Sequence, residues 1–583
     1  MLRYRIIAWP RKHGPGVSSP ENLKAAARLR FCLGGRPMFT QLVNPTGNLF
    51  LTWIVALIPV VALLLMLAVL RLSAWLATLI GSIITFLLAA WVWNMPIDGG
   101  LLAYLYGSAT GVWNVDWITF WGVMLFNTLV VTGVFDKIRR WLIAQGTADV
   151  RVQTILFAWA FGALLEGLVG FGFPWAFVAP ILISLGIPAL DAIRVAAIAN
   201  NAPVSYGALG APIIALAAVT AGTLGIQQND LLMAFSGSVG KVVAILALLP
   251  PWILLYLVSG RDGMWEAWPL AIVGSLGYIA GQLPVAVYLG PYLPDVAGSI
   301  VCFVALLLLL KAWRPRIVRG YGGRAVSAAD QAALGGGAHN LSGSELFGAW
   351  LPFIVLVVVV VLWTGPWSVL PKYVPFKLAI AANSSIDPGK TVTAAFNWAP
   401  AVAGTAILVS WILIALLLRL SGAQLAEVAR KTWHQMWGAL LVGVFIFGLA
   451  YVFNFSGMAN SLAKGFSTIG PWFIVVAPVL GWIGVALSGS NTSTNAMFGA
   501  FQASVGKLLG FPLLLLPTLN SVGAEIGKPV APQTASVGVS TTQYVRNEGA
   551  VIRHNMGWTF VLLVYLVVIG IACYLFFPGI AMK

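Results

Sequence analysis

Two matched runs organise this chain: Asn-Asn-Ala-Pro-Val-Ser-Tyr-Gly-Ala-Leu-Gly-Ala-Pro at residues 200–212, and Asn-Ser-Val-Gly-Ala-Glu-Ile-Gly-Lys-Pro-Val-Ala-Pro at residues 520–532. Both runs interrupt apolar segments that otherwise have the composition of membrane spans. The match is carried by Asn200, Gly207 and Pro212 in the first run and by Asn520, Gly527 and Pro532 in the second. Interrupted helices at corresponding places in two halves of a chain are the best sequence indication of a transporter binding site.

Each run follows a second irregular stretch inside an apolar region. These stretches are the glycine-rich residues 165–174 and the glycine- and hydroxyl-rich residues 488–495. The surrounding regions, 152–186 and 472–510, each have the length of two half-helices. We interpret them as re-entrant hairpins whose tips are the irregular stretches.

Composition places the whole chain in a membrane. It is 60% hydrophobic and 9% charged, whereas soluble domains are roughly 25% charged. Apolar runs close to the ~20 residues that cross a bilayer recur along the sequence. The prediction is therefore an all-α polytopic membrane protein. The candidate spans are 49–70, 73–94, 115–135, 236–259, 266–288, 296–312, 347–365, 398–418, 434–455 and 555–577.

The repeats predict a division of the chain. Short amphipathic pieces at 98–113 and 457–469 precede the two hairpins and further indicate internal duplication. The predicted parts are a basic N-terminal extension at 1–37; a first repeat at 38–260 with hairpin 152–186 and interrupted helix 190–222; linking spans and a cytoplasmic loop at 261–346; and a second repeat at 347–583 with hairpin 472–510 and interrupted helix 512–543.

Loop charges predict that the repeats are inverted. Basic residues follow the spans at 115–135, 296–312 and 398–418 and the second interrupted helix, and placing all four loops in the cytoplasm satisfies the positive-inside rule. The first hairpin then enters from the cytoplasm and the second from outside, with the C-terminus outside. A basic arm at 1–37 would break the same rule, which favours Met38 as the physiological start.

The net charge of +16 has this topological explanation, so no nucleic-acid partner is expected. The scattered cysteines and histidines match no disulfide, metal or cofactor pattern. A membrane-embedded enzyme would need a catalytic cluster that the sequence does not show, and a channel would leave the matched hairpins without a purpose. The sequence leaves homo-oligomerisation open.

Half-helices that end within a membrane predict a solute site. Their ends expose unpaired N–H and C=O groups that lipid cannot satisfy. N-termini attract a carboxylate, whereas free carbonyls coordinate a cation or a proton donor. The glycines at 170, 172, 207, 489 and 527 would let a solute approach the backbone. The alternative is that these residues are ordinary kinks and helix-packing glycines.

Ionisable residues at the breaks are the candidates for ion coupling. Glu166 at the first tip is either a proton-coupling site or a carboxylate that caps backbone N–H groups. Glu525 and Lys528 lie three residues apart and could pair on one helical turn. Lys528 could instead meet a substrate carboxylate or pair with Glu166 across the repeats. Residues 491–495 offer amide and hydroxyl groups for a solute or sodium, and some would only cap a half-helix.

On its motifs the chain resembles the L-lactate permease family, bacterial 2-hydroxy-monocarboxylate:proton symporters that also take up glycolate. The resemblance runs from about Met38 to the C-terminus. Its motifs are Asn44-Pro45-Thr46-Gly47-Asn48; Leu165-Glu166-Gly167 with Gly170-Phe171-Gly172; Asn200 through Pro212; Ser488 through Phe498; and Asn520 with Gly527-Lys528 and Pro532-Gln533. Grouping of that family within the ion transporter superfamily implies inverted repeats, a scaffold domain and a moving domain with both hairpins, hence an elevator-type transporter.

Four positions depart from the pattern of that family. It usually has small residues where Phe173 and Trp175 stand, Asp at the place of Asn491, and an apolar or small residue at Glu525. Bulky aromatic residues would reshape the pocket, and the altered carboxylates would relocate charge within the site or change the coupling ion.

The sequence thus predicts a secondary active transporter of a bacterial inner membrane that imports lactate or glycolate by proton symport. The alternative is a sodium-coupled carboxylate transporter of the same architecture. The predicted proton-coupling residues are Glu166 and Glu525. The predicted substrate-binding residues are Gly170, Gly172, Asn200, Asn201, Ser490, Asn491, Thr492, Ser493, Asn495, Asn520 and Lys528. The predicted pocket-shaping residues are Phe171, Phe173 and Trp175.

Overall fold

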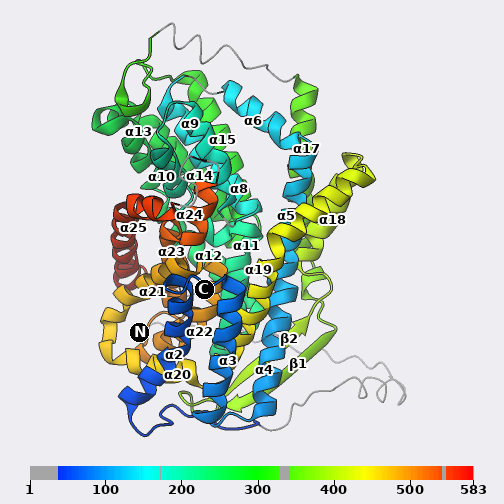
Figure 1. Ribbon diagram of the computed structural model, residues 1–583, viewed down its shortest axis with the longest axis vertical. Helices are drawn as coiled ribbons and strands as arrows, with labels where there is room; N and C mark the ends of the chain where they lie inside the picture. The colour runs from blue at the N-terminus through cyan, green and yellow to red at the C-terminus, as the bar shows by residue number, and fades with distance from the viewer. Residues whose placement is uncertain are drawn as a thin grey trace, which may run out of the picture.

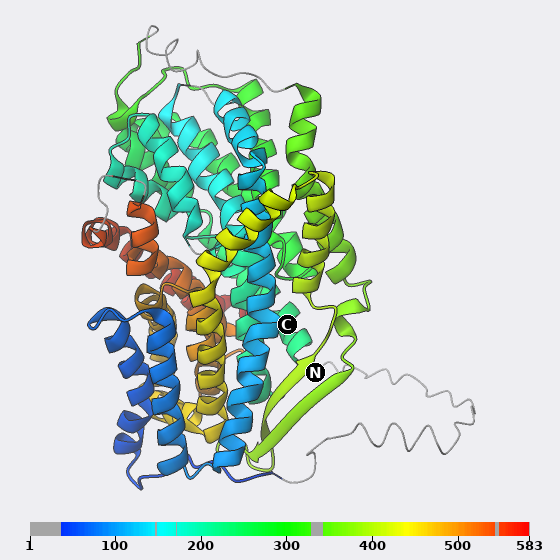
Figure 2. The ribbon, with the colours of Figure 1, turned by 45° about the vertical axis from the view of Figure 1, so that its right-hand side comes forward.

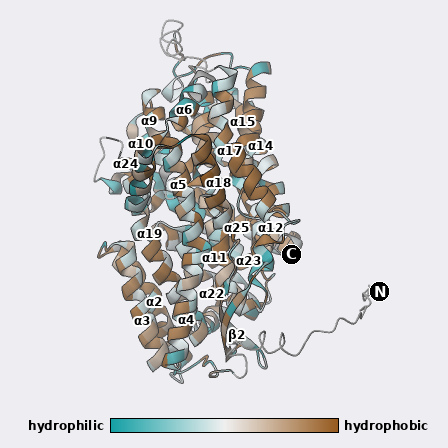
Figure 3. Cartoon of the chain, turned by 90° about the vertical axis from the view of Figure 1, so that its right-hand side faces the viewer, coloured by the Kyte–Doolittle hydropathy of each residue, from teal (hydrophilic) through white to brown (hydrophobic). Residues whose placement is uncertain are grey.

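The computed structural model describes residues 37–145, 148–170, 172–327, 342–540, 542 and 547–581. Within these residues, eleven helices are long and apolar enough to cross a membrane. The helices pack side by side into one elongated bundle (Figure 1), and hydrophobic residues recur along the length of the helices (Figure 3). The predicted polytopic helical membrane protein is confirmed.

The first part of the chain forms helices on both sides of the first hairpin. In order these are α2 (Leu49–Ala68), α3 (Ala74–Trp91), α4 (Ile97–Thr110), the π-helical η1 (Gly111–Asp116), α5 (Trp117–Val131), α6 (Val134–Gln145), α7 (Val150–Thr154), the π-helical η2 (Ile155–Phe161), α8 (Gly162–Leu168), α9 (Phe173–Ser184), α10 (Ala189–Ala199), the 3-10 turn η3 (Val204–Tyr206) and α11 (Gly207–Leu224).

The middle of the chain contains α12 (Gln228–Leu246), α13 (Pro250–Glu266), α14 (Trp268–Tyr288), α15 (Pro294–Ala312), η4 (Tyr321–Gly323), α17 (Gly343–Thr364) and η5 (Leu370–Lys372). After strands β1 (Phe376–Asn383) and β2 (Thr391–Trp398) come α18 (Ala403–Leu417), α19 (Gly422–Ser456), α20 (Met458–Phe466), η6 (Ser467–Trp472), α21 (Phe473–Ser488), α22 (Asn491–Leu509), α23 (Leu515–Gly527), η7 (Lys528–Val530), α24 (Pro532–Val539), α25 (Glu548–Phe576) and η8 (Pro578–Ala581).

Two spans differ from the sequence prediction. The predicted amphipathic piece at 98–113 and span at 115–135 form one continuous column, α4–η1–α5, because a π-helical turn joins them (Figure 1). The predicted single span at 236–259 is instead two helices, α12 and α13. Pro250 and Pro251 open α13, and since proline lacks an N–H it cannot continue the preceding helix.

A β-hairpin lies between α17 and α18, where the sequence analysis assigned no element. Strands β1 and β2 are antiparallel, with Phe376 opposite Trp398 and Asn383 opposite Thr391. The first described residues join them: the Met38 N–H donates to the Ala381 carbonyl at 2.8 Å. The hairpin lies beside one end of α4 (Figure 2).

Each repeat contains a helix pair that turns back at a glycine tip and a helix that is broken. Gly170 and Gly172 have φ values of 69° and 78° at the first tip, and Gly489 has 70° at the second, a region in which glycine carries no steric penalty. The first broken helix is α10–η3–α11 and the second is α23–η7–α24. The tips converge because α11 packs against α22 and α24 packs against α9.

The two breaks begin at different places within the matched runs. In the first, α10 ends at Ala199, so Asn200 starts the break. In the second, α23 continues through Asn520 to Gly527 and the break starts at Lys528. The reason is the spacing of proline, because Pro203 closely follows Asn200 whereas Pro529 is the first proline after Asn520.

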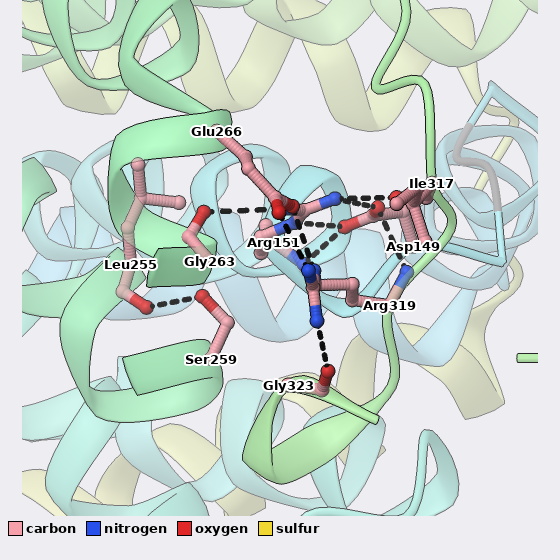
Figure 4. A network of polar contacts seen from close by, with 9 residues as sticks. All are labelled: Asp149, Arg151, Leu255, Ser259, Gly263, Glu266, Ile317, Arg319 and Gly323. Atoms are coloured by element: carbon pink, nitrogen blue, oxygen red, sulfur yellow. Dashed lines mark hydrogen bonds and ion pairs between the residues drawn. The ribbon is translucent and has the colours of Figure 1, made fainter. Parts of the chain in front are cut away.

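A polar clasp, buried at Arg151 and Asp149 and partly exposed at Glu266 and Arg319, fixes the start of the first hairpin (Figure 4). The Arg151 Nη2 forms an ion pair with Asp149 Oδ2 at 2.6 Å, and its Nη1 approaches Glu266 Oε2 at 3.1 Å. Arg319 Nη2 pairs with Glu266 Oε1 at 2.5 Å, and the Glu266 carboxylate raises the pKa of Arg319 above its ordinary value. Arg151 is one of the basic residues after the predicted span at 115–135 that were placed in a cytoplasmic loop, but its side chain is fully buried.

Candidate functional site

An ion pair joins the two repeats at the centre of the bundle. Glu166, in the last turn of α8, accepts the Lys528 ammonium of η7 on Oε1. Asn200, at the end of α10, donates its Nδ2 to Glu166 Oε2 at 3.1 Å. The exposed fractions are 1% for Glu166, 4% for Lys528 and 2% for Asn200. Of the alternatives open for Lys528, the structure therefore has the pairing with Glu166 across the repeats.

Glycine at position 207 makes room for the Glu166 carboxylate. A Cβ atom added at Gly207 would lie 2.6 Å from Glu166 Oε1, closer than real Cβ contacts occur. Gly170 lies on the other side, where an added Cβ would be 3.7 Å from the same oxygen. The ion pair is therefore seated in a cradle of two glycines, one from the first tip and one from the first broken helix.

Gly207→Ala is expected to destabilise the fold by about 1–3 kcal/mol, the usual result of overpacking. Its φ of −58° and ψ of 153° suit alanine, so the loss would come from displacement of Glu166. Thermal unfolding of the purified protein measures this loss of stability. Gly557→Ala on α25 is the control, because nothing lies within 4 Å of its added Cβ. Equal stability of the two variants would contradict the prediction.

Glu525 faces the opposite broken helix. Its Oε1 accepts the Ser205 N–H of η3 at 3.0 Å, and the Ser205 hydroxyl lies 3.1 Å from the Ser521 hydroxyl. Its Oε2 has no hydrogen-bond partner within the described part of the chain. Glu525 is 0% exposed, and an ionised carboxylate in such a place is costly without a partner. The pairing of Glu525 with Lys528, an alternative from the sequence, is not the arrangement found.

The second tip presents the N-terminus of α22. Ser490 is its N-cap, and the Ser490 hydroxyl accepts the Ser493 N–H at 3.2 Å. This hydroxyl therefore caps the helix. Asn491 Nδ2 donates to the Ser521 carbonyl at 3.2 Å, whereas its Oδ1 has no partner among the described residues. The first N–H groups of the helix have no intrahelical acceptor. This end of α22 therefore combines free N–H groups with one amide oxygen.

Asn495 and Asn520 lie deeper and satisfy one another. Asn520 Nδ2 donates to Asn495 Oδ1 at 3.0 Å, and Asn495 Nδ2 donates to the Ser521 hydroxyl at 3.0 Å and the Pro212 carbonyl at 3.1 Å. These bonds connect α22, α23 and the first broken helix. Both residues hold the site together, which supports a positioning role more than direct contact with a solute.

A cavity of about 40 Å³ lies between the two tips. It has room for about one water molecule, whose share of liquid volume is about 30 Å³. Its walls are Thr119, Glu166, Gly170, Val204, Gly207, Ala208, Pro212, Gly489, Ser490, Asn491, Thr492 and Lys528. The ion pair, the cradle and the end of α22 therefore line one cavity.

A larger cavity of about 400 Å³ adjoins it and shares Thr119, Gly489, Ser490 and Thr492 with the smaller one. This volume falls in the range of about 300–1,000 Å³ found for ligand pockets. Helices α2, α3, α5 and α19 form one side, and the second tip and α24 form the other. A solute in the larger cavity would reach Lys528 by passing the second tip.

The backbone beside the small cavity is strained. Ala208 and Leu209 have left-handed φ values of 47° and 56°, followed by Gly210 at 83°. Such a conformation costs a non-glycine residue about 1–3 kcal/mol and concentrates at functional sites. Ala208 lines the cavity, so the strain lies where the first broken helix meets the ion pair.

The other predicted site residues surround this centre. An added Cβ at Gly172 would meet Thr534 of α24 at 2.6 Å, and Trp175 packs against Gly538 of the same helix. Asn201 is 1% exposed, and its side-chain atoms have no partner in the described residues. Ser493 lines the larger cavity. Phe171 and the side chain of Phe173 lie outside the described residues.

Three groups near the site were missed or set aside in the sequence analysis. Asp116 received no role, yet it is buried, lines the larger cavity and leaves Oδ2 without a partner among described residues. Asp295 and Tyr278 were not singled out, because they lie at the end and in the middle of ordinary spans. Asp295 could have been singled out from the sequence, because an aspartate at the start of a membrane-spanning helix is uncommon.

Comparison with known proteins assigns the chain to a family. The model of the family described as L-lactate permease matches residues 52–578. The chain belongs to the L-lactate permease family. Membership makes this chain a multi-pass membrane transporter rather than an enzyme.

Individual relatives agree with this membership. The glycolate permease GlcA of Escherichia coli (strain K12) is 34% identical over 555 residues, which cover 91% of this permease-family chain and 97% of GlcA. The L-lactate permease of Bacillus subtilis (strain 168) is 31% identical over 557 residues, with coverages of 91% and 97%. Among solved structures, MtrF of Neisseria gonorrhoeae aligns with a TM-score of 0.47 at 11% identity, covering 88% of this chain and 97% of MtrF.

Proposed function

We propose that this protein imports small 2-hydroxy monocarboxylates, such as lactate and glycolate, by proton symport across a bacterial inner membrane. The observation that carries the proposal is the buried Glu166–Lys528 pair on the cavity between the two tips. Relatives named glycolate permease and L-lactate permease support the substrate class.

The cavity offers groups that match a 2-hydroxy acid. The substrate carboxylate would bind the Lys528 ammonium and the free N–H groups at the start of α22, where the helix dipole also favours an anion. The substrate hydroxyl would donate to Asn491 Oδ1, the amide oxygen without a protein partner. Since the cavity measures about 40 Å³, the second tip would move aside when the solute enters from the larger cavity.

Competition for Lys528 gives proton coupling a physical basis. In the empty site the ammonium neutralises Glu166. A substrate carboxylate that binds Lys528 brings a second negative charge into a buried space, where an unpaired charge costs several kcal/mol. Protonation of Glu166 removes the excess charge, so one proton would enter with each anion. Glu525, whose Oε2 also has no partner among the described residues, is the second group able to hold a proton.

The movement that completes the cycle is part of the proposal. We infer that residues 38–260 and 347–583 act as inverted repeats, linked by 261–346, and that both hairpins move together in an elevator-type cycle. The C-terminus would lie outside. Packing of α11 on α22 and of α24 on α9 supports a common moving unit.

Glu166→Gln tests the proposal. Proton-driven uptake of radiolabelled lactate or glycolate into vesicles is expected to fall by about 10–100-fold, because a hydrogen-bonded charge contributes about 1.5–3 kcal/mol. Glu427→Gln, an exposed glutamate on α19, is the matched control. Unchanged uptake by Glu166→Gln would contradict the assigned role. Wild-type uptake that follows an imposed sodium gradient, and not a proton gradient, would contradict proton symport itself.

A further inference from the structure

Another buried carboxylate, Asp295, lies behind the first hairpin tip. Asp295 stands in the first turn of α15 and is 1% exposed. The Tyr278 hydroxyl of α14 donates to Asp295 Oδ1 at 2.8 Å. Oδ2 has no hydrogen-bond partner among the residues that the structure describes. A fully buried carboxylate with one hydrogen bond is far from satisfied, since an ionised one accepts several.

The helix that carries Glu166, α8, packs directly against the start of α15 at Asp295. A Cβ added at Gly167 would lie 2.7 Å from the Asp295 Cβ, so glycine next to Glu166 permits the close approach of α8 and α15. Asp295 lies within electrostatic range of both Glu166 and Lys528. Asp295 is therefore part of the same charge cluster as the ion pair, although it does not line the small cavity.

The charged and titratable groups around Asp295 come from five elements. They are Glu166 on α8, Tyr206 on η3, Tyr278 on α14, Glu525 on α23 and Lys528 on η7. Among the described residues of this cluster there are three carboxylates and one ammonium. With every carboxylate ionised the cluster would carry two uncompensated negative charges, which a buried site does not tolerate. Protons must therefore reside on it.

Geometry separates the three carboxylates. Glu166 is committed to Lys528 while the site is empty, and Glu525 Oε1 accepts the Ser205 N–H. Among the described residues, the hydrogen bond that Asp295 accepts comes from the Tyr278 hydroxyl. Asp295 lies outside the cavity lining, so a proton held there leaves the solute space free. Its closeness to Glu166 lets its charge influence whether Glu166 stays ionised when a substrate competes for Lys528.

We propose that Asp295, oriented by Tyr278, is a proton-holding residue of the coupling cycle. It binds a proton as a neutral acid while Glu166 is ionised in the empty site, and it releases that proton when the loaded site opens to the other side of the membrane. As the substrate leaves and Lys528 pairs with Glu166 again, the proton on Glu166 passes to Asp295, so one proton crosses with each anion. The inference rests on the proposed proton symport. Tyr278 is a positioning residue, because it acts through the Asp295 carboxylate.

Asp295→Asn separates coupling from binding, because asparagine imitates the permanently neutral acid. In vesicles, proton-driven accumulation of lactate or glycolate is expected to fall by about tenfold or more, because the variant has lost the residue that holds the proton during the cycle. Exchange of internal for external substrate without a gradient is expected to stay within about threefold of wild type, because exchange needs no net proton movement. Asp295→Glu is expected to recover part of the accumulation.

The controls distinguish a coupling role from a structural one. Asp230→Asn on the exposed start of α12 is the matched substitution. Loss of accumulation and exchange together, with a lower unfolding temperature, would show that Asp295 only supports the fold and would overturn the proposal. Accumulation equal to wild type would overturn it as well. If the wild type itself ignores a proton gradient, the proposed symport fails instead, which is a distinguishable outcome.

Discussion

Lys528→Met is expected to reduce uptake by about 100-fold, the consequence of losing about 3 kcal/mol from a buried charge contact. It is also expected to lower the free energy of unfolding by about 3–5 kcal/mol, since removing one partner leaves the other charge buried without compensation. Glu166 is 1% exposed, and its remaining partner is the Asn200 amide. Vesicle uptake and thermal unfolding in detergent measure the two effects.

A double variant separates the two consequences. Lys528→Met combined with Glu166→Gln removes both charges, so stability is expected to return towards wild type, while uptake stays low because the substrate carboxylate has no ammonium to bind. The coupling energy from the complete cycle would then be large and stabilising. Lys431→Met is the control, because its pair with Glu427 is exposed and is worth about 0–1 kcal/mol. Normal uptake by Lys528→Met would contradict the proposed site.

The matched breaks and hairpins were predictable because they depend on local chemistry. Proline removes a backbone donor wherever it stands, and glycine permits the left-handed φ that Gly170 and Gly489 adopt. The hairpin tips and helix interruptions therefore follow from sequence spacing alone. The same reasoning found Glu166 and Lys528 as candidates, since charges inside apolar segments are rare and expensive.

The partners of those charges were not predictable in the same way. Lys528 had three plausible anions from sequence, and the choice of Glu166 depends on the glycine cradle that Gly207 and Gly170 provide in space. Asp295 lies at the first turn of a span, where an acidic residue commonly favours the helix dipole. Its role in the charge cluster emerges only because Gly167 brings α8 against α15.

Irregular backbone was the other feature beyond local reasoning. The sequence does not predict the left-handed backbone of Ala208 and Leu209, because neither alanine nor leucine favours that conformation. Tertiary contacts must hold them: an added Cβ at Gly210 would lie 2.5 Å from the Pro291 carbonyl oxygen, so the chain approaches its neighbour closely there. The β-hairpin was missed for a related reason, since its short strands lie between long apolar spans that dominate the composition.

Arg151→Met is expected to lower the free energy of unfolding by about 3–5 kcal/mol, the range for breaking a buried ion pair. Both Arg151 and Asp149 have 0% exposed side chains. The guanidinium also donates to the Gly263 carbonyl at 3.1 Å and the Ile317 carbonyl at 2.7 Å. Its loss would therefore leave a carboxylate and two carbonyls short of a donor. Thermal unfolding of the purified protein measures the effect.

Arg319→Met provides the contrast within the same clasp (Figure 4). Its ion pair with Glu266 is partly exposed, at 21% and 39%, and such pairs contribute about 0–1 kcal/mol. Its backbone bonds to Asp149 and Val150 survive the substitution. Arg151→Lys should fall between the two, because an ammonium keeps the charge but lacks the planar fork that reaches several acceptors. If Arg319→Met lowered the free energy of unfolding as much as Arg151→Met, the contribution of these ion pairs would not depend on their burial. That result would contradict the prediction.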